Sequence, residues 1–92
     1  MREKGMEIIY GNKAVKQLTK INKGNKKMFA KIDEAIVKYA ENPECNIDVK
    51  PLIGLDNYYR IRINEYRIIF QIEDEKMLIL DVDLRGSIYK KG

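Results

Sequence analysis

The chain has 92 residues, of which 45% are hydrophobic and 35% charged, and its formal net charge is +4. This length predicts one domain, residues 1–92, with one small core. No apolar run approaches membrane-spanning length, and no apolar stretch follows the basic N-terminal residues as it does in a signal peptide. We therefore expect a cytoplasmic protein. A chain with no His and with Cys45 as its one cysteine is expected to hold neither a zinc ion nor an internal disulfide, and we expect no cofactor.

The positive charge is concentrated at the front of the chain. Residues 1–31 contain nine Lys or Arg against two acidic residues, a net charge of +7. Such a segment suits a polyanion or an acidic partner. On charge alone, the plainer interpretation is a solvated lysine face that keeps the protein soluble.

The N-terminal half predicts one strand followed by a helix. Met6–Tyr10 is rich in residues that favour strands. The apolar positions of Lys13–Asn22 recur at helical spacing, with lysines on the opposite face. Asn12 is the expected N-cap of this helix, and Gly24 is expected to be left-handed at its C-terminus.

A second, longer helix is predicted to begin at an Asn25 cap and to stop at Asn42-Pro43. The short link at Gly24-Asn25 makes the two helices an antiparallel hairpin. The apolar residues of the second helix form a stripe that is typical of a core, with no sign of a cofactor site: Met28, Phe29, Ile32, Ala35, Ile36, Tyr39 and Ala40.

The C-terminal half is predicted to be a loop over residues 43–57 followed by three strands. These strands are Tyr58–Ile63, Tyr66–Glu73 and Lys76–Leu84, joined by two-residue turns. The expected fold class is α+β in the order β-α-α-β-β-β, with an antiparallel sheet packed on the N-terminal helical hairpin.

Arginines are expected to gather on one face of this sheet. Successive side chains of a strand point to opposite faces, so Arg60 and Arg62 share the face away from the core. A two-residue turn at Asn64-Glu65 would place Arg62 directly opposite Arg67, which is destabilising unless a negative group compensates. That group is either Asp81 or Asp83 of the last strand, a structural role, or a bound phosphate, a functional one. The sequence leaves both interpretations open.

A tyrosine lies near the chain end, four residues after Arg85. Tyr89 either covers the edge of the sheet or stacks on a nucleobase, as aromatic side chains do in proteins that bind single-stranded RNA.

Residues Lys50 to Phe70, together with Arg85-Gly-Ser-Ile-Tyr89, closely resemble the central motif and C-terminus of the RelE/ParE toxin superfamily. The predicted order of elements matches as well. The resemblance implies a toxin of a type II toxin–antitoxin system whose partner is an antitoxin encoded beside it. Members of the RelE branch are endonucleases that cut mRNA on the ribosome, whereas ParE members poison DNA gyrase.

By the same resemblance, the catalytic residues of a RelE-like nuclease fall on five positions of this chain: Arg60, Arg62, Arg67, Arg85 and Tyr89. ParE-type toxins usually lack this set, so the resemblance favours the RelE-like branch. The chain departs from several relatives in having Leu84 where they have histidine before the arginine. Arginine is a poor general base because it stays protonated. The base is therefore left open between Tyr89, Asp81 and a group of the ribosome.

Three functions are consistent with the sequence and the resemblance. The first is a metal-independent, ribosome-dependent mRNA endonuclease that inhibits translation. The second is a ParE-like gyrase inhibitor without nuclease chemistry. The third is a non-toxic relative that only binds a partner, because one fold hosts several functions.

Overall fold

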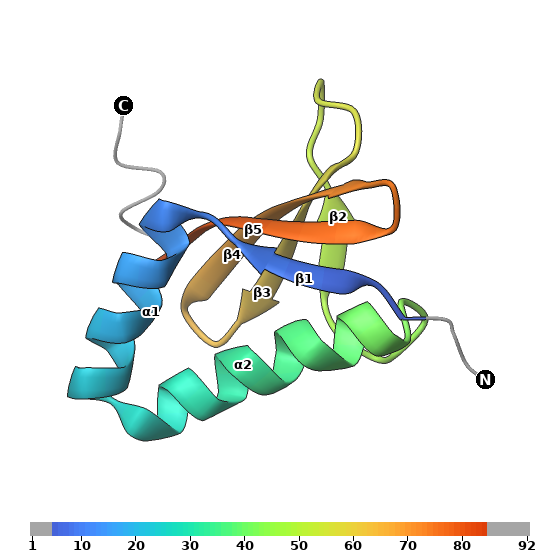
Figure 1. Ribbon diagram of the computed structural model, residues 1–92. Helices are drawn as coiled ribbons and strands as arrows, with labels where there is room; N and C mark the ends of the chain where they lie inside the picture. The colour runs from blue at the N-terminus through green and yellow to red at the C-terminus, as the bar shows by residue number, and fades with distance from the viewer. Residues whose placement is uncertain (1–4, 85–92) are drawn as a thin grey trace.

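A computed structural model describes residues 5–84 and shows two helices and five strands along them. In chain order these elements are β1 (Glu7–Tyr10), α1 (Asn12–Gly24), α2 (Lys26–Glu41), β2 (Val49–Pro51), β3 (Tyr58–Ile63), β4 (Tyr66–Glu73) and β5 (Lys76–Leu84). Both helices lie on the same side of the sheet (Figure 1). Neither helix in the described part of the chain is long and apolar enough to cross a membrane.

The strands form one sheet in the order β1-β5-β4-β3-β2, which confirms the predicted α+β class. Two details differ from the prediction. β1 pairs with β5 in parallel, so the sheet is mixed. The segment predicted as a loop over residues 43–57 contains β2, which pairs with the start of β3. β2 has three residues and ends in Pro51, which lacks an N–H donor and is tolerated because β2 is an edge strand.

The caps of the helices follow the prediction in part. Asn25 caps α2 as expected, since its side-chain oxygen accepts a hydrogen bond from the Met28 N–H at 3.1 Å. The N-cap of α1 is Gly11, not Asn12, and no side chain caps that end. Gly11 lies close to β5, where its N–H donates to the Ile79 carbonyl at 2.9 Å. Gly24 belongs to α1 and is not left-handed, because the chain turns at Asn25 instead.

The core lies between the sheet and the helices. The apolar stripe of α2 is buried as predicted, with Ile32 and Ile36 completely covered. Phe70 of β4 is fully buried between Tyr39 and Tyr59, whose ring centroids lie 5.3 and 5.6 Å away. Each large apolar side chain buried in this way contributes about 1.5–3 kcal/mol. Figure 1 shows that α1 and α2 diverge from their joint at Asn25, so the two helices of the hairpin do not lie side by side along their length.

Candidate functional site

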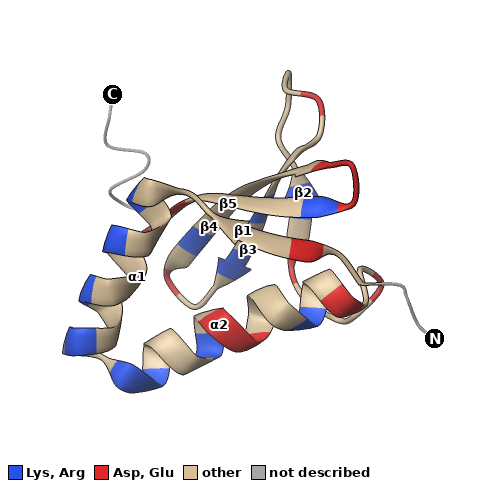
Figure 2. Cartoon of the chain, viewed as in Figure 1, with Lys and Arg blue, Asp and Glu red and all other residues tan. Residues whose placement is uncertain are grey.

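Three arginines lie on the face of the sheet that the helices leave uncovered, and we call them the arginine face: Arg60, Arg62 and Arg67. The alternation along β3 gives this arrangement, because Tyr59 and Ile61 point into the core. The predicted register is confirmed: Arg62 is the Cα partner of Arg67 across the two-residue turn. Figure 2 shows the basic positions of β3 and β4 at the centre of the sheet.

A β-bulge decides which acidic residue joins the arginine face. The pairing of β4 with β5 shifts by one residue, since Phe70 pairs with Ile79 and Ile69 with Asp81. The extra residue, Leu80, moves the aspartates that follow it to the outer face. Asp83 then becomes the Cα partner of Arg67. One row across three strands therefore carries two arginines and one aspartate, so Asp83 compensates the positive charge only in part.

Asp81 is engaged elsewhere. Its Oδ1 accepts a hydrogen bond from Gln17 Nε2 at 2.8 Å, and its Oδ2 lies 3.4 Å from Lys13 Nζ. Both oxygens thus contact α1. Of the two aspartates considered from the sequence, Asp83 is the one that lies in the row of Arg62 and Arg67.

Arg60 is the most buried member of the arginine face, with 8% of its surface exposed. Its Nη2 lies 3.9 Å from Asp48 Oδ1, which is a loose ion pair. Its Nη1 is buried and has no hydrogen-bond partner among residues 5–84. A buried guanidinium with so little compensation is costly, because burial removes the water that would otherwise solvate the charge. An anion at this position would supply the missing partner.

Sequence reasoning missed Asp48 and Lys50. The backbone carbonyl of Asp48 accepts a hydrogen bond from the Arg62 N–H at 3.0 Å, so Asp48 contacts both β3 arginines. Lys50 of β2 is the Cα partner of Arg60 and adds a fourth positive charge to this face. The signal was present, since the polar residues Asp48 and Lys50 alternate with the apolar Ile47 and Val49.

Arg85 and Tyr89 lie outside the described residues. The strand that leads to them is described to its end: β5 stops at Leu84, the Cα partner of Tyr66. The structure therefore brings together Arg60, Arg62 and Arg67 of the predicted set.

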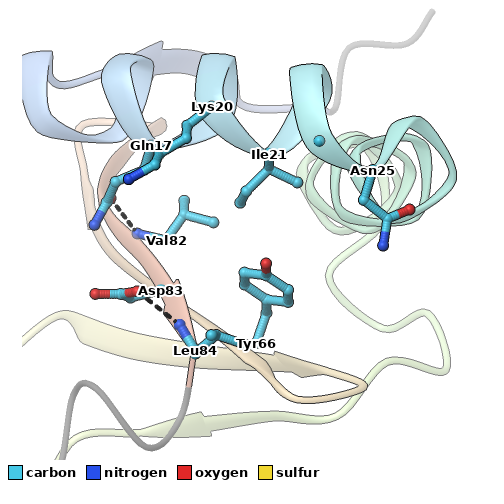
Figure 3. A pocket seen from close by; sticks show the side chains of 9 residues that line it. Gln17, Lys20, Ile21, Asn25, Tyr66, Val82, Asp83 and Leu84 are labelled. Atoms are coloured by element: carbon cyan, nitrogen blue, oxygen red, sulfur yellow. Dashed lines mark hydrogen bonds between the residues drawn. The ribbon is translucent and has the colours of Figure 1, made fainter.

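A groove of about 450 Å³ lies between the C-terminal half of α1 and the adjoining ends of β4 and β5. Figure 3 shows Tyr66 pointing across it toward Ile21. Lys20 and Asp83 also line the groove, so the basic side of α1 adjoins the end of the arginine row.

Neither tyrosine with a perturbed pKa belongs to the arginine face. Burial raises the pKa of Tyr10 above its ordinary value, and the Asp33 carboxylate raises it further. Burial also raises the pKa of Tyr39, followed by the effects of Tyr59 and Cys45. Both tyrosines pack with the core on the helix side of the sheet. No three His, Cys, Asp or Glu side chains come together within residues 5–84 in a way that suits a metal ion.

The fold and the arginine face define a small α+β protein with a basic sheet face, and comparison with known proteins shows its family. Residues 8–89 match the family described as "ParE toxin of type II toxin-antitoxin system, parDE", and the chain belongs to that family within the RelE/ParE superfamily. It is similar to toxin RelE3 of Methanocaldococcus jannaschii, with 29% identity over 84 residues that cover 91% of this chain and 96% of the relative.

Two solved structures show the same fold. The YoeB dimer from Staphylococcus aureus has a TM-score of 0.75 at 23% identity, covering 85% of this chain and 94% of that one. The RelB–RelE antitoxin–toxin complex from Methanococcus jannaschii has a TM-score of 0.66 at 28% identity, covering 88% and 94%. The resemblance seen in the sequence motif is therefore confirmed over nearly the whole chain.

Proposed function

We propose that this toxin is a metal-independent, ribosome-dependent endonuclease that cuts mRNA. The observation that carries the proposal is the opposition of Arg62 and Arg67 beside a buried Arg60. Like charges directly across a ladder destabilise a sheet, and Asp83 offsets one of them. A phosphate group supplies the remaining negative charge, and the planar fork of arginine matches its oxygens.

The chemistry needs no metal ion. The 2′-oxygen of the ribose attacks the adjacent phosphorus, its bond to phosphorus forms, and the bond from phosphorus to the 5′-oxygen breaks. The phosphorus group gains negative charge on the way, and preorganised donors stabilise that charge. In this proposal Arg67 and Arg85 hold the scissile phosphate. Arg60 and Arg62 position the RNA backbone, and the ring of Tyr89 stacks on a nucleobase.

A general base must take the 2′-hydroxyl proton, and an acid must protonate the 5′-oxygen. The contacts of Asp81 with Gln17 and Lys13 argue against that carboxylate as the base. Tyr89 or a group of the ribosome remains as the base.

The partner in this proposal is an antitoxin from an adjacent gene. RelE of Methanococcus jannaschii, at 28% identity, is found in a complex with RelB. An acidic, partly disordered segment would suit the basic surface of this chain and fold as it binds. Co-expression of the neighbouring gene product is expected to restore growth, and growth arrest that persists in its presence would contradict this partner.

Gyrase inhibition is the second candidate, because the matching family is described by the ParE toxin. Inducing the protein in cells distinguishes the two. An endonuclease halts translation first and leaves new mRNA ends, which are mapped by sequencing 5′ termini. A gyrase poison halts replication first and leaves broken DNA. Broken DNA with intact mRNA would overturn the proposed nuclease.

A further inference from the structure

The outer side of α1 carries a line of lysines that the proposed reaction does not use. Lys16, Lys20 and Lys23, which we call the lysine stripe, follow one another at steps of four and three residues and so lie on one side of the helix. All three are exposed, and none forms an ion pair with any residue between 5 and 84. α1 contains no acidic residue.

The lysine stripe lies on the helix that packs beside β5, the strand that carries Asp83 opposite Arg67. Lys13, one turn ahead of the stripe, reaches Asp81, which lies on the outer face of the sheet. Lys20 lines the groove that Asp83 also lines, and Asp83 is the Cα partner of Arg67 (Figure 3). Figure 2 shows basic positions running down α1, which carries no acidic one, and acidic positions at the β4–β5 turn among other places.

We infer that the lysine stripe is a track for the phosphodiester backbone of an RNA strand that reaches the arginine face. The inference rests on the proposed function, which places an RNA phosphate between Arg62 and Arg67. The stripe extends about 10 Å along the helix axis from Lys16 to Lys23. This length is enough to contact phosphates of the strand next to the one that reacts.

The make-up of this surface favours RNA over a protein partner. The centres of protein–protein interfaces are depleted in lysine and contain aromatic and apolar residues. The lysine stripe faces away from the core side of α1, where Ala14 and Leu18 are buried, and Val15 is the one large apolar side chain of α1 that is exposed. Flexible, fully solvated ammonium groups suit a phosphate backbone, which is bound chiefly through charge.

Two variants with the same change of charge test the track. Lys16→Gln/Lys20→Gln removes two charges from the stripe, and Lys38→Gln/Lys76→Gln removes two from the other end of the molecule. Glutamine supports a helix about as well as lysine, and Lys76 is an exposed residue at the start of β5, so the folds should be preserved, as melting curves will show. The probe is a fully 2′-O-methylated RNA of about 12 nucleotides, which binds but cannot be cut because it lacks the attacking hydroxyl.

Binding is measured by fluorescence anisotropy over a range of salt concentrations. Each contact with a phosphate of a single strand contributes about 0.7 to the slope of log K against log salt. The stripe variant is therefore expected to lose about 1.4 from the slope, and the control variant is expected to keep the wild-type slope. An unchanged slope in the stripe variant, an equal loss in the control, or no binding by the wild type would each overturn the track.

Two further arms separate the alternatives. If the stripe variant binds polyglutamate more weakly while its RNA slope stays unchanged, the surface serves an acidic protein and the inference is wrong. Arg67→Gln reports on the proposed function independently. If Arg67→Gln still cuts mRNA, the arginine site is wrong. The track is still supported in that case if the stripe variant lowers the slope of log K against log salt.

Discussion

Arg60 and Asp48 form a loose pair in which the arginine is buried and the aspartate is not. Nη2 of Arg60 lies 3.9 Å from Asp48 Oδ1, and the two side chains are 10% and 45% exposed. A pair of this kind contributes little to stability, because the desolvation of the buried charge offsets the attraction. The fold therefore gains little from the positive charge of Arg60.

This relationship predicts opposite effects for two substitutions. Arg60→Met should leave the melting temperature unchanged or raise it, since it replaces a poorly compensated buried charge with an apolar side chain of similar length. The same variant should lose toxicity. Asp48→Ala should lower the melting temperature, because it removes a carboxylate that partly compensates the buried guanidinium. Thermal melts and growth assays provide both readouts. An Arg60→Met protein that melts far below the wild type would show that Arg60 is structural.

Arg67→Ala and Arg85→Ala are expected to abolish growth inhibition while the fold remains intact. Losing one preorganised donor to a developing charge costs about 100- to 1,000-fold in rate. Circular dichroism checks the fold, and mapping of mRNA ends checks the activity. Two folded variants with full toxicity would remove both arginines from the site.

Tyr89 is expected to act through its ring. Tyr89→Phe should keep much of the toxicity and Tyr89→Ala should lose it, because a stacked base contributes about 1–3 kcal/mol and does not need the hydroxyl. Both variants should unfold near the wild-type midpoint, because stacking on a nucleobase stabilises the complex with RNA and not the free protein. A folded but inert Tyr89→Phe protein would instead make the hydroxyl an acid or a base.

Stability is expected to fall as the pH rises above about 10. Burial first, and Asp33 second, raise the pKa of Tyr10 above its ordinary 10.0, and burial also raises the pKa of Tyr39. In the unfolded chain these tyrosines lose their protons at lower pH than in the folded protein. The unfolded state is therefore favoured as pH passes 10, and below that pH the effect is absent. Denaturant titrations of Tyr10→Phe should show a shallower alkaline loss than the wild type, and an identical loss would contradict this account.

The turn between β4 and β5 is expected to be strained. Asp74 and Glu75 both have positive φ, at 53° and 61°, a conformation that is unfavourable for residues other than glycine. Glu75→Gly creates the Asp-Gly sequence that such two-residue hairpins prefer, and should stabilise the protein by about 1 kcal/mol. Glu75→Ala is the control, because it removes the same charge and keeps the strain. Equal melting temperatures for the two variants would show that the strain is small.

The local parts of this fold could be predicted from sequence, because short-range rules determine them. Alternation places Arg60 and Arg62 on one face, and a two-residue turn at Asn64-Glu65 sets Arg62 against Arg67. The bulge at Leu80 could not be predicted, because it arises from packing. With regular alternation after Ile79, Asp81 would face the core and Val82 the solvent, and the extra residue reverses both.

Contacts between residues far apart in the chain could not be predicted from the sequence either. The alternation from Ile47 to Lys50 could have indicated a short strand but not its neighbour in the sheet, so the contact of Asp48 with Arg60 could not be predicted. Gly11 caps α1 because its N–H bonds to Ile79 of a strand 68 residues away along the chain. Such roles depend on the pairing of distant strands, which no local pattern records.

Gln17 covers part of the edge of β5 that β1 leaves unpaired. β1 covers the edge of β5 only as far as Ile79, and beyond that point the strand would offer unpaired backbone groups. Gln17 Oε1 accepts the Val82 N–H at 2.6 Å, so one side chain of α1 occupies the place of a neighbouring strand. A bare strand edge is a template for another chain. The amide of Gln17 thus keeps the Val82 N–H from pairing with a strand of another molecule, and so opposes edge-to-edge association of sheets.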